Sequence, residues 1–222
     1  MIDVTPHRRA LEDRIAVVTK LIDETHPKGP VAGPISREAR GLAIVLLFAA
    51  YEELLVSLTR TLLEAVVRLR ISNRRLQPGL RAFALRSSAE SLRDVSERRL
   101  FISALPNLVD VAARSDQKPT VNTGDFPKDG SFMKQSQIKV WAKTFGVDHP
   151  RLILSHVWDS IDAIVVQRNG VAHGSLTPQE VGRAYSEDEI RQLVADWWAD
   201  WDAFLLHVNG LASSRNFFRL PR

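Results

Sequence analysis

Apolar residues recur along most of this chain at intervals of three and four positions, the spacing of a helix that buries one face. The clearest example runs from about residue 187 to 212. Ser186, just before it, and Glu189, in its first turn, have the spacing of a capping box, in which each side chain accepts the backbone N–H of the other residue. We expect a long helix that packs against other helices through a seam of seven residues: Ile190, Val194, Trp197, Trp201, Phe204, Val208 and Leu211.

Two more long helices are predicted in the first third of the chain. One spans about residues 6–23, and its apolar face is Leu11, Ile15, Val18 and Ile22. Residues 26–36 hold three prolines and two glycines and must be a connection. Ser36 can then cap a second helix over residues 37–69. Its predicted seam consists of Val45, Ala49, Glu52, Val56, Thr59 and Leu63.

The middle of the chain is less regular. Prolines interrupt it, and we expect only short helices near residues 80–89 and 105–113. Residues 115–131 form the longest stretch without periodicity and predict a long irregular loop. Residues 135–145 resemble a short helix that Gly146 stops.

A further helical stretch covers residues 148–173, with Pro150 near its first turn. The chain has no run of alternating apolar and polar residues that would indicate a strand. We therefore predict a single all-α domain over residues 1–222. The apolar face of the helix predicted over residues 148–173 is Leu154, Val157, Ile161, Ile164 and Val165.

Composition excludes several kinds of site. The chain contains no cysteine, which excludes a disulfide framework, a thiol nucleophile and a cysteine-based zinc site. None of its six histidines forms the H-x-x-x-H or H-E-x-x-H pattern of a helical zinc site, and the glycine-rich phosphate loops are missing. We expect no metal and no cofactor.

Positive charge is concentrated in one region of a chain whose net charge is only +4. Residues 60–99 hold ten arginines, no lysine and four acidic residues. Two interpretations stay open, a solvated helical surface and a surface that faces phosphate, which the planar arginine fork binds well. On the second interpretation Arg70, Arg74 and Arg75 are candidate RNA-binding residues.

The sequence predicts a soluble, cytoplasmic protein without a membrane segment. The N-terminus has no apolar signal core. The most apolar run, residues 41–51, is about half the length that spans a bilayer.

The string RNGVAHG, residues 168–174, holds two features that are unusual for a plain helix end. Arg168 follows Ile161 and Ile164 by seven and four residues, so this cation lies near the apolar face and needs an anionic partner. Gly170 costs about 1 kcal/mol relative to alanine within a helix, so we expect another group to approach closely there. Alternatively, Asn169 and Gly170 simply end the helix in a turn.

Glu52 is the candidate partner for Arg168. Its predicted position among apolar neighbours makes an unpaired carboxylate costly. We therefore predict that Glu52 lies within salt-bridge reach of Arg168 and supports it. The alternative is that Glu52 sits at the edge of the seam and reaches water.

The string RNGVAHG resembles the signature of the HEPN superfamily, in the form typical of its RiboL-PSP-HEPN branch. The similarity extends to FAAYEELL, residues 48–55, to IKVWAKTFGVD, residues 138–148, and to the final long helix. Together these segments cover roughly residues 37–212. The resemblance implies an up-and-down bundle of four or five helices that forms a homodimer. It also implies a metal-independent endoribonuclease, although some members of the family only bind or scaffold.

The resemblance assigns catalysis to Arg168, Asn169 and His173. Histidine has a reference pKa of about 6.5 and can act as acid or base on an RNA 2′-hydroxyl or leaving oxygen. Arginine can stabilise charge on the phosphorane-like transition state. Arg168 and His173 lie about 140° apart around a regular helix, so we expect two motifs to meet across a dimer axis.

The sequence therefore predicts an endoribonuclease that cleaves RNA by attack of the 2′-hydroxyl, in a toxin, stress or phage-defence setting. An antitoxin or a defence-system protein is a possible partner. The alternative is a non-catalytic module of the same fold that binds nucleic acid or protein.

Overall fold

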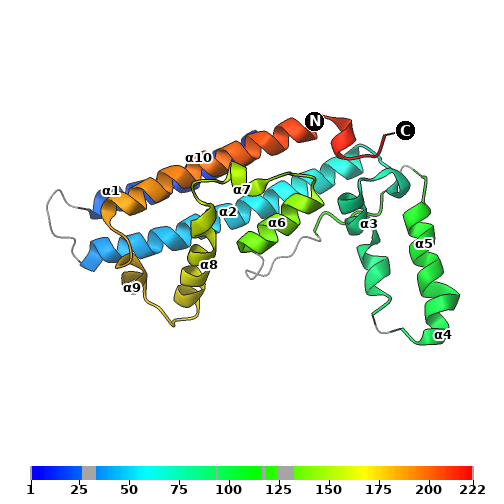
Figure 1. Ribbon diagram of the computed structural model, residues 1–222, viewed down its shortest axis with the longest axis horizontal. Helices are drawn as coiled ribbons and strands as arrows, with labels where there is room; N and C mark the ends of the chain where they lie inside the picture. Colours follow the sequence, from blue (N-terminus) through cyan, green and yellow to red (C-terminus); the bar gives the residue numbers. More distant parts are fainter. Residues whose placement is uncertain (1, 27–33, 94, 117–118, 125–132, 222) are drawn as a thin grey trace.

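Three long helices lie side by side and form the body of the molecule (Figure 1). The computed structural model describes residues 2–26, 34–93, 95–116, 119–124 and 133–221. These parts contain no strand, only a single antiparallel bridge between Leu76 and Arg219, so the all-α prediction is confirmed. The long helices are α1 (Thr5–Thr25), α2 (Pro34–Arg68) and α10 (Glu187–Ala212).

The remaining helices are short and lie beside or below this body (Figure 1). On one side are α6 (Gln135–Thr144), α7 (Pro150–Ile153), α8 (Trp158–Ala172) and α9 (Pro178–Gly182). At the other end a second group projects downward. It consists of α3 (Pro78–Glu90), α4 (Glu97–Arg99), the π-helix Leu100–Ala104 and α5 (Leu105–Ala113).

Most of the predicted helices are confirmed. The apolar face of α1 is buried, and the capping box at Ser186 and Glu189 starts α10. Helices α3, α5 and α6 match the short segments expected, and Gly146 takes a positive φ of 65° just after α6. The described residues between 115 and 124 form no helix, whereas residues 117–118 and 125–131 of the expected loop lie outside the described parts.

Helix α2 is the centre of the fold, because α1, α8, α9 and α10 all pack against it. The seam predicted for α2 is mostly wrong, because the buried faces of the helix are rotated away from it. Val45, Ala49, Glu52 and Val56 are only partly buried, although Thr59 and Leu63 are fully buried. With neighbours on several sides α2 buries more than one stripe, which includes Ile44, Leu47, Phe48, Tyr51, Leu54, Leu55, Leu58 and Leu62.

Ser36 does not cap α2 as expected, because the helix begins two residues earlier at Pro34. Its hydroxyl instead donates to the carbonyl oxygen of Thr25 over 2.7 Å, which ties the end of α1 to the start of α2.

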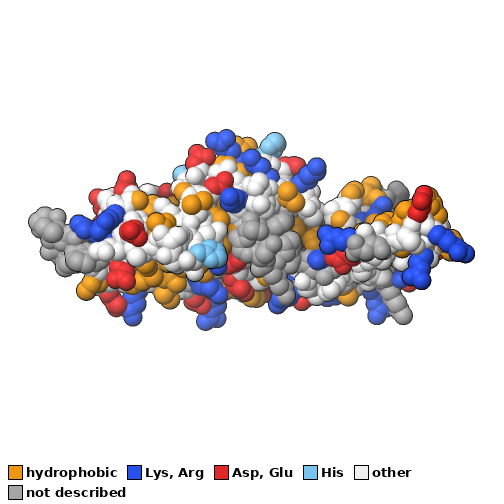
Figure 2. Space-filling model, turned by 90° about the horizontal axis from the view of Figure 1, so that it is seen from below, with side chains coloured by type: hydrophobic (Ala, Val, Ile, Leu, Met, Phe, Trp, Pro, Cys, Tyr) orange, Lys and Arg blue, Asp and Glu red, His pale blue; other side chains and the backbone are white. Residues whose placement is uncertain are grey.

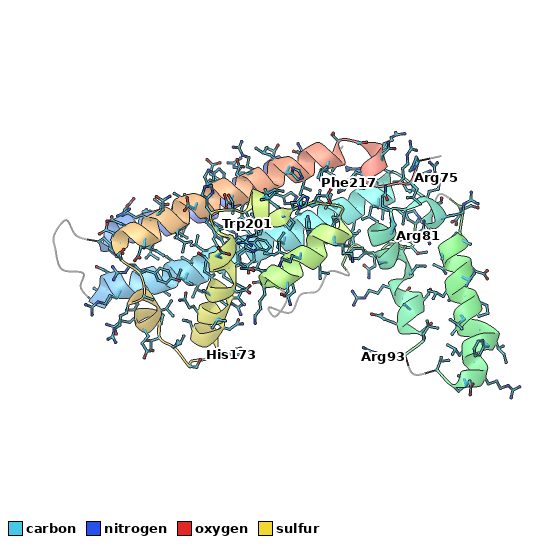
Figure 3. All side chains as sticks on the ribbon, in the orientation of Figure 1. Arg75, Arg81, Arg93, His173, Trp201 and Phe217 are labelled. Carbon is cyan, nitrogen blue, oxygen red and sulfur yellow. The ribbon has the colours of Figure 1, made fainter. Side chains whose placement is uncertain are left out.

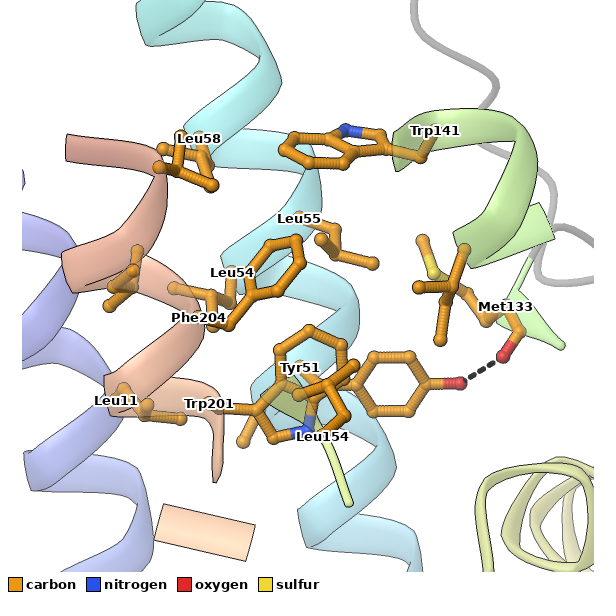
Figure 4. Close-up of a cluster of buried hydrophobic side chains, with 14 of the residues drawn as sticks. Leu11, Tyr51, Leu54, Leu55, Leu58, Met133, Trp141, Leu154, Trp201 and Phe204 are labelled. Carbon is orange, nitrogen blue, oxygen red and sulfur yellow. Dashed lines mark hydrogen bonds between the residues drawn. The ribbon is translucent and has the colours of Figure 1, made fainter. Parts of the chain in front are cut away.

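A cluster of aromatic side chains joins α2, α6 and α10 in the core (Figure 4). The rings of Tyr51 and Trp201 stack with centroids 5.3 Å apart, and the Tyr51 hydroxyl donates to the carbonyl oxygen of Met133. The indole N–H of Trp141 donates to the hydroxyl of Thr59 over 2.7 Å. Burial raises the pKa of Tyr51 far above its usual range, so its hydroxyl stays a donor.

The helix expected over residues 148–173 is broken, which corrects the prediction. Helix α7 ends at Ile153 and α8 begins at Trp158. The buried carboxylate of Asp200, on α10, accepts the backbone N–H groups of His156 and Val157 over 2.8 and 3.0 Å. Such groups before a helix have no intrahelical acceptor, so the carboxylate stabilises the break. The three- and four-residue spacing of apolar residues continues across residues 154–157, so the sequence pattern does not show where the helix breaks.

By length and composition alone, Ile35–Arg68 could cross a membrane, and it is the one described helix that could. The apolar stretch is therefore longer than the run over residues 41–51. Inside the bundle 56% of its most apolar window is buried, as expected for a core helix. Cytoplasmic localisation stays a prediction.

We expect Asp200→Asn to lower the free energy of unfolding by about 3 kcal/mol, because the charged acceptor of two backbone N–H groups is lost. The hydrogen bond and the charge of Asp200 raise the pKa of His156 above its usual range. The stability from this pair is therefore full below about pH 6.5 and is lost as the pH rises through the higher folded pKa.

Urea unfolding at several pH values and NMR titration of His156 measure both effects. The substitution should return the titration of His156 toward its ordinary value. Asp110→Asn, on the exposed face of α5, is the control and should change neither quantity. An unchanged His156 titration in Asp200→Asn would contradict the assignment.

Candidate functional site

The string RNGVAHG forms the C-terminal end of α8 and the first residues beyond it. The helix ends at Ala172, and Gly174 follows with a positive φ of 72°. The N–H of Gly174 donates to the carbonyl oxygen of Val171, and the N–H of Ser175 donates to that of Gly170 over 2.9 Å. This is the Schellman pattern, in which glycine takes the left-handed position after a helix.

Gly170 lies inside the helix, so the interpretation that Asn169 and Gly170 end it in a turn is wrong. The close approach expected at this glycine is real, but the approaching group is the chain itself. A Cβ on Gly170 would lie 2.6 Å from Cδ1 of Leu176. The described structure thus accounts for both glycines of the string by the way the helix ends.

Arg168 is half-buried against α2. Its guanidinium carbon lies 4.5 Å from the centre of the Phe48 ring, and Nη1 donates to Oδ1 of Asn169 over 3.1 Å. Within the described residues no carboxylate lies within 4.0 Å of this guanidinium. Since a guanidinium has five N–H donors, Arg168 keeps donors and a positive charge for an anion.

Glu52 lies one turn of α2 beyond Phe48 but does not pair with Arg168. The predicted salt bridge is wrong, because the aromatic ring takes the place beside the guanidinium. The two groups still interact over a longer distance. Burial raises the pKa of the half-buried Glu52 carboxyl, and the charge of Arg168 opposes that rise.

His173 is the C-cap of α8, and its side chain is exposed. Within the described parts its imidazole makes no hydrogen bond, and its backbone N–H donates to the carbonyl oxygen of Asn169 over 3.0 Å. Figure 3 shows it at the end of α8 that points away from the three long helices. The imidazole is thus open to a ligand, and nothing within the described parts of this chain orients it.

One neighbour of the site was not predicted. The Tyr185 hydroxyl donates to the side-chain oxygen of Gln167 over 2.7 Å and links α8 to the segment before α10. Tyr185 belongs to none of the predicted apolar helix faces, and this was the only feature of the sequence that pointed to a polar contact.

The predicted RNA-binding arginines lie far from the motif. Arg70 follows the last turn of α2, whereas Arg74 and Arg75 belong to the short 3-10 helix Asn73–Arg75. In Figure 3 Arg75 and His173 lie toward opposite ends of the molecule. The chain therefore does not bring these arginines and the motif into one site.

Other polar clusters hold the helices together. His7 contacts the hydroxyls of Ser57 and Thr61 at 3.0 and 2.9 Å, which joins α1 to α2, and burial lowers the pKa of this histidine. Buried Arg40 donates to the carbonyl oxygen of Gly182. Across the described residues no group of three or more histidine, cysteine or acidic side chains is arranged to hold a metal.

Comparison with protein-family models, with curated proteins and with solved structures finds no match to this chain. The resemblance to HEPN proteins therefore rests on the motif and its neighbouring segments alone.

We predict that Gly170→Ala stabilises the protein only when Leu176 is shortened. Alanine at position 170 gains about 1 kcal/mol of helix propensity. In the natural chain the new Cβ meets the Leu176 side chain, so the gain is cancelled or reversed. In Leu176→Ala most of the gain should appear, because only Cβ of residue 176 then remains close, at 3.3 Å from the new Cβ.

Urea unfolding of the two single variants, the double variant and the natural chain measures this coupling. An equal effect of Gly170→Ala in both backgrounds would show that Leu176 is not what requires the glycine.

Proposed function

We propose that this chain is a metal-independent endoribonuclease of the HEPN kind, with Arg168, Asn169 and His173 as its catalytic residues. The observation that carries the proposal is the environment of the Arg168 guanidinium. Its guanidinium is half-buried on Phe48 without a carboxylate partner in the described structure, at the same helix end as an exposed imidazole. An arginine and a histidine so arranged suit a phosphodiester.

The proposed reaction is an internal transfer at phosphorus. A base removes the proton of the RNA 2′-hydroxyl, the oxygen attacks the adjacent phosphate, and an acid protonates the leaving 5′-oxygen. Arg168 stabilises the additional negative charge in the transition state. Asn169, which accepts a hydrogen bond from Arg168, positions the guanidinium. The products are a 2′,3′-cyclic phosphate and a 5′-hydroxyl.

A homodimer supplies what one chain lacks. Each motif has one histidine, whereas the reaction works best with an acid and a base. The exposed apolar side chains on α2 and α8 are of the kind that a second copy covers, with exposures of 38% for Leu42, 36% for Leu46 and 59% for Val166. Two His173 side chains would then face each other across the axis.

The setting that this activity suits is a toxin, stress or phage-defence system in the cytoplasm, with an antitoxin or defence protein as partner. A non-catalytic module that binds nucleic acid or protein is the second candidate. The imidazole of His173, without a hydrogen bond to orient it in the described chain, favours this alternative.

We expect His173→Ala and Arg168→Ala each to lower the rate of RNA cleavage by about 100- to 10,000-fold, the usual contribution of one acid, base or charge-stabilising group. Cleavage of a labelled RNA in EDTA measures it. His207→Ala and Arg14→Ala remove an exposed histidine and an exposed arginine from other helices and should leave the rate unchanged. A requirement for a divalent ion, or full activity without His173, would overturn the mechanism.

Mixing the two inactive variants tests the dimer. If two motifs form one composite cleft, the cleavage rate of the heterodimer of His173→Ala and Arg168→Ala chains should differ from the mean of the rates of the two homodimers. Activity of the mixture is measured after exchange of subunits, and size-exclusion chromatography measures assembly. Additive defects would indicate two independent sites, and a monomer with full activity would exclude the shared cleft.

A further inference from the structure

A pocket lined by arginines lies where α2 ends, far from the motif. It has a volume of about 370 Å³ and is bounded by Arg70, Arg75, Arg215 and Arg219, together with Ser72 and Ser115. Among the described residues that line it, none is acidic. In Figure 3 the labels of Arg75 and Phe217 mark this end of the molecule, and His173 lies toward the other.

Paired backbone segments build the pocket. The C-terminal segment runs against residues 75–77. The N–H of Leu220 donates to the carbonyl oxygen of Arg75 over 2.8 Å, and the N–H of Gln77 donates to the carbonyl oxygen of Phe218 over 3.1 Å. The Phe218 side chain is buried and anchors the segment in the core. Arg75 is thus held beside Arg215 and Arg219, which are far from it in the sequence, and Arg70 lies five residues before Arg75.

Among the described residues these arginines have no anionic partner. Within the described residues no carboxylate lies within 4.0 Å of any of the four guanidinium groups. Nε of Arg219 is buried and has no hydrogen-bond acceptor in the described chain. Four like charges around one pocket also repel one another, and an anion held among them would relieve that repulsion.

The backbone at Arg70 gives independent support. Arg70 follows α2 with a φ of 50°, the left-handed region in which glycine is the usual residue after a helix. Its N–H donates to the carbonyl oxygen of Val67 and closes the helix end. An arginine in this strained position, at the edge of a pocket of arginines, indicates that its side chain is needed there.

We propose that this pocket binds a phosphoryl group. The planar guanidinium forks match the paired oxygens of phosphate, and arginine is the preferred residue for such recognition. The volume exceeds what inorganic phosphate alone needs and falls at the small end of ligand pockets, so the phosphoryl group belongs to a larger molecule such as a nucleotide. The proposal does not depend on the endoribonuclease activity, because it concerns other residues at the other end of the molecule.

The surface around this end is suited to an anionic ligand. In Figure 2, over the end of the molecule formed by α3, α4 and α5, basic side chains predominate over acidic ones. Arg98 and Arg99 on α4 are exposed. Since the phosphoryl group can come from an RNA chain or from a free nucleotide, the experiment has an arm for each source.

Isothermal titration of the His173→Ala protein, in which RNA cleavage is not expected, tests the pocket. The probes are adenosine 5′-monophosphate, a short oligoribonucleotide with a 5′-phosphate and the same oligoribonucleotide without it. Tighter binding of the two probes with a terminal phosphate identifies a monoester site, and equal binding of both oligoribonucleotides identifies recognition of the internal phosphodiester. Either result supports the proposal, and binding of none of the three overturns it.

Substitutions locate the binding. Arg219→Met and Arg215→Met should each weaken the measured affinity about ten- to hundredfold, the usual effect of losing charge-assisted hydrogen bonds. Arg14→Met removes the same charge from an exposed position on α1 and should change it little. Arg215 is exposed, so its variant keeps the test valid even if Arg219→Met fails to fold. Unchanged affinity in both pocket variants would overturn the proposal.

Arg70→Gly provides a readout of opposite sign. Glycine accepts the left-handed backbone without strain, so this variant should raise the midpoint of urea unfolding while it weakens phosphate binding. A variant that is both more stable and binds as well as the natural chain would show that the strained arginine has no part in binding.

Discussion

The rest of the structure depends on the need to cover α2. This helix buries residues on most of its circumference, so no single partner can shield it from water. Helices α1 and α10 cover it along its length, and α8 and α9 cover its first half. The closest approach is that of α9, where a Cβ on Gly41 would lie 1.8 Å from the carbonyl oxygen of Pro178 and one on Gly182 would lie 1.7 Å from that of Arg37.

The motif lies next to this close approach along the chain. Residues 173–177 connect the end of α8 to α9, which is held against the backbone of α2, so they limit how far the end of α8 can lie from α2. Arg168 then comes to rest on Phe48, and its charge stays without a carboxylate partner in the described chain. A stacked ring stabilises a guanidinium less than an ion pair does, but it leaves the hydrogen-bond donors available.

Positive charge without a carboxylate partner among the described residues is thus present at two separate places on the molecule. At one place it comes from a single arginine beside an exposed imidazole, which suits chemistry on a phosphodiester. At the other place the charge comes from four arginines around a pocket whose described lining holds no acidic residue, which suits the binding of an anion. The two arrangements serve one function if the same RNA reaches both, and two functions if it does not.

The sequence by itself determined the helical class, most of the helices and the buried faces of α1, α8 and α10, because periodic burial is a property of each segment. It also singled out Arg168 and Gly170 as unusual. Only the tertiary structure decided that α8 starts at Trp158, since the carboxylate that stabilises the break comes from Asp200 on α10. The same holds for Phe48 beside Arg168, for Leu176 over Gly170 and for the arginine pocket. In each case the deciding atom comes from another element or from beyond the helix end, and the spacing of apolar residues within one helix carries no information about it.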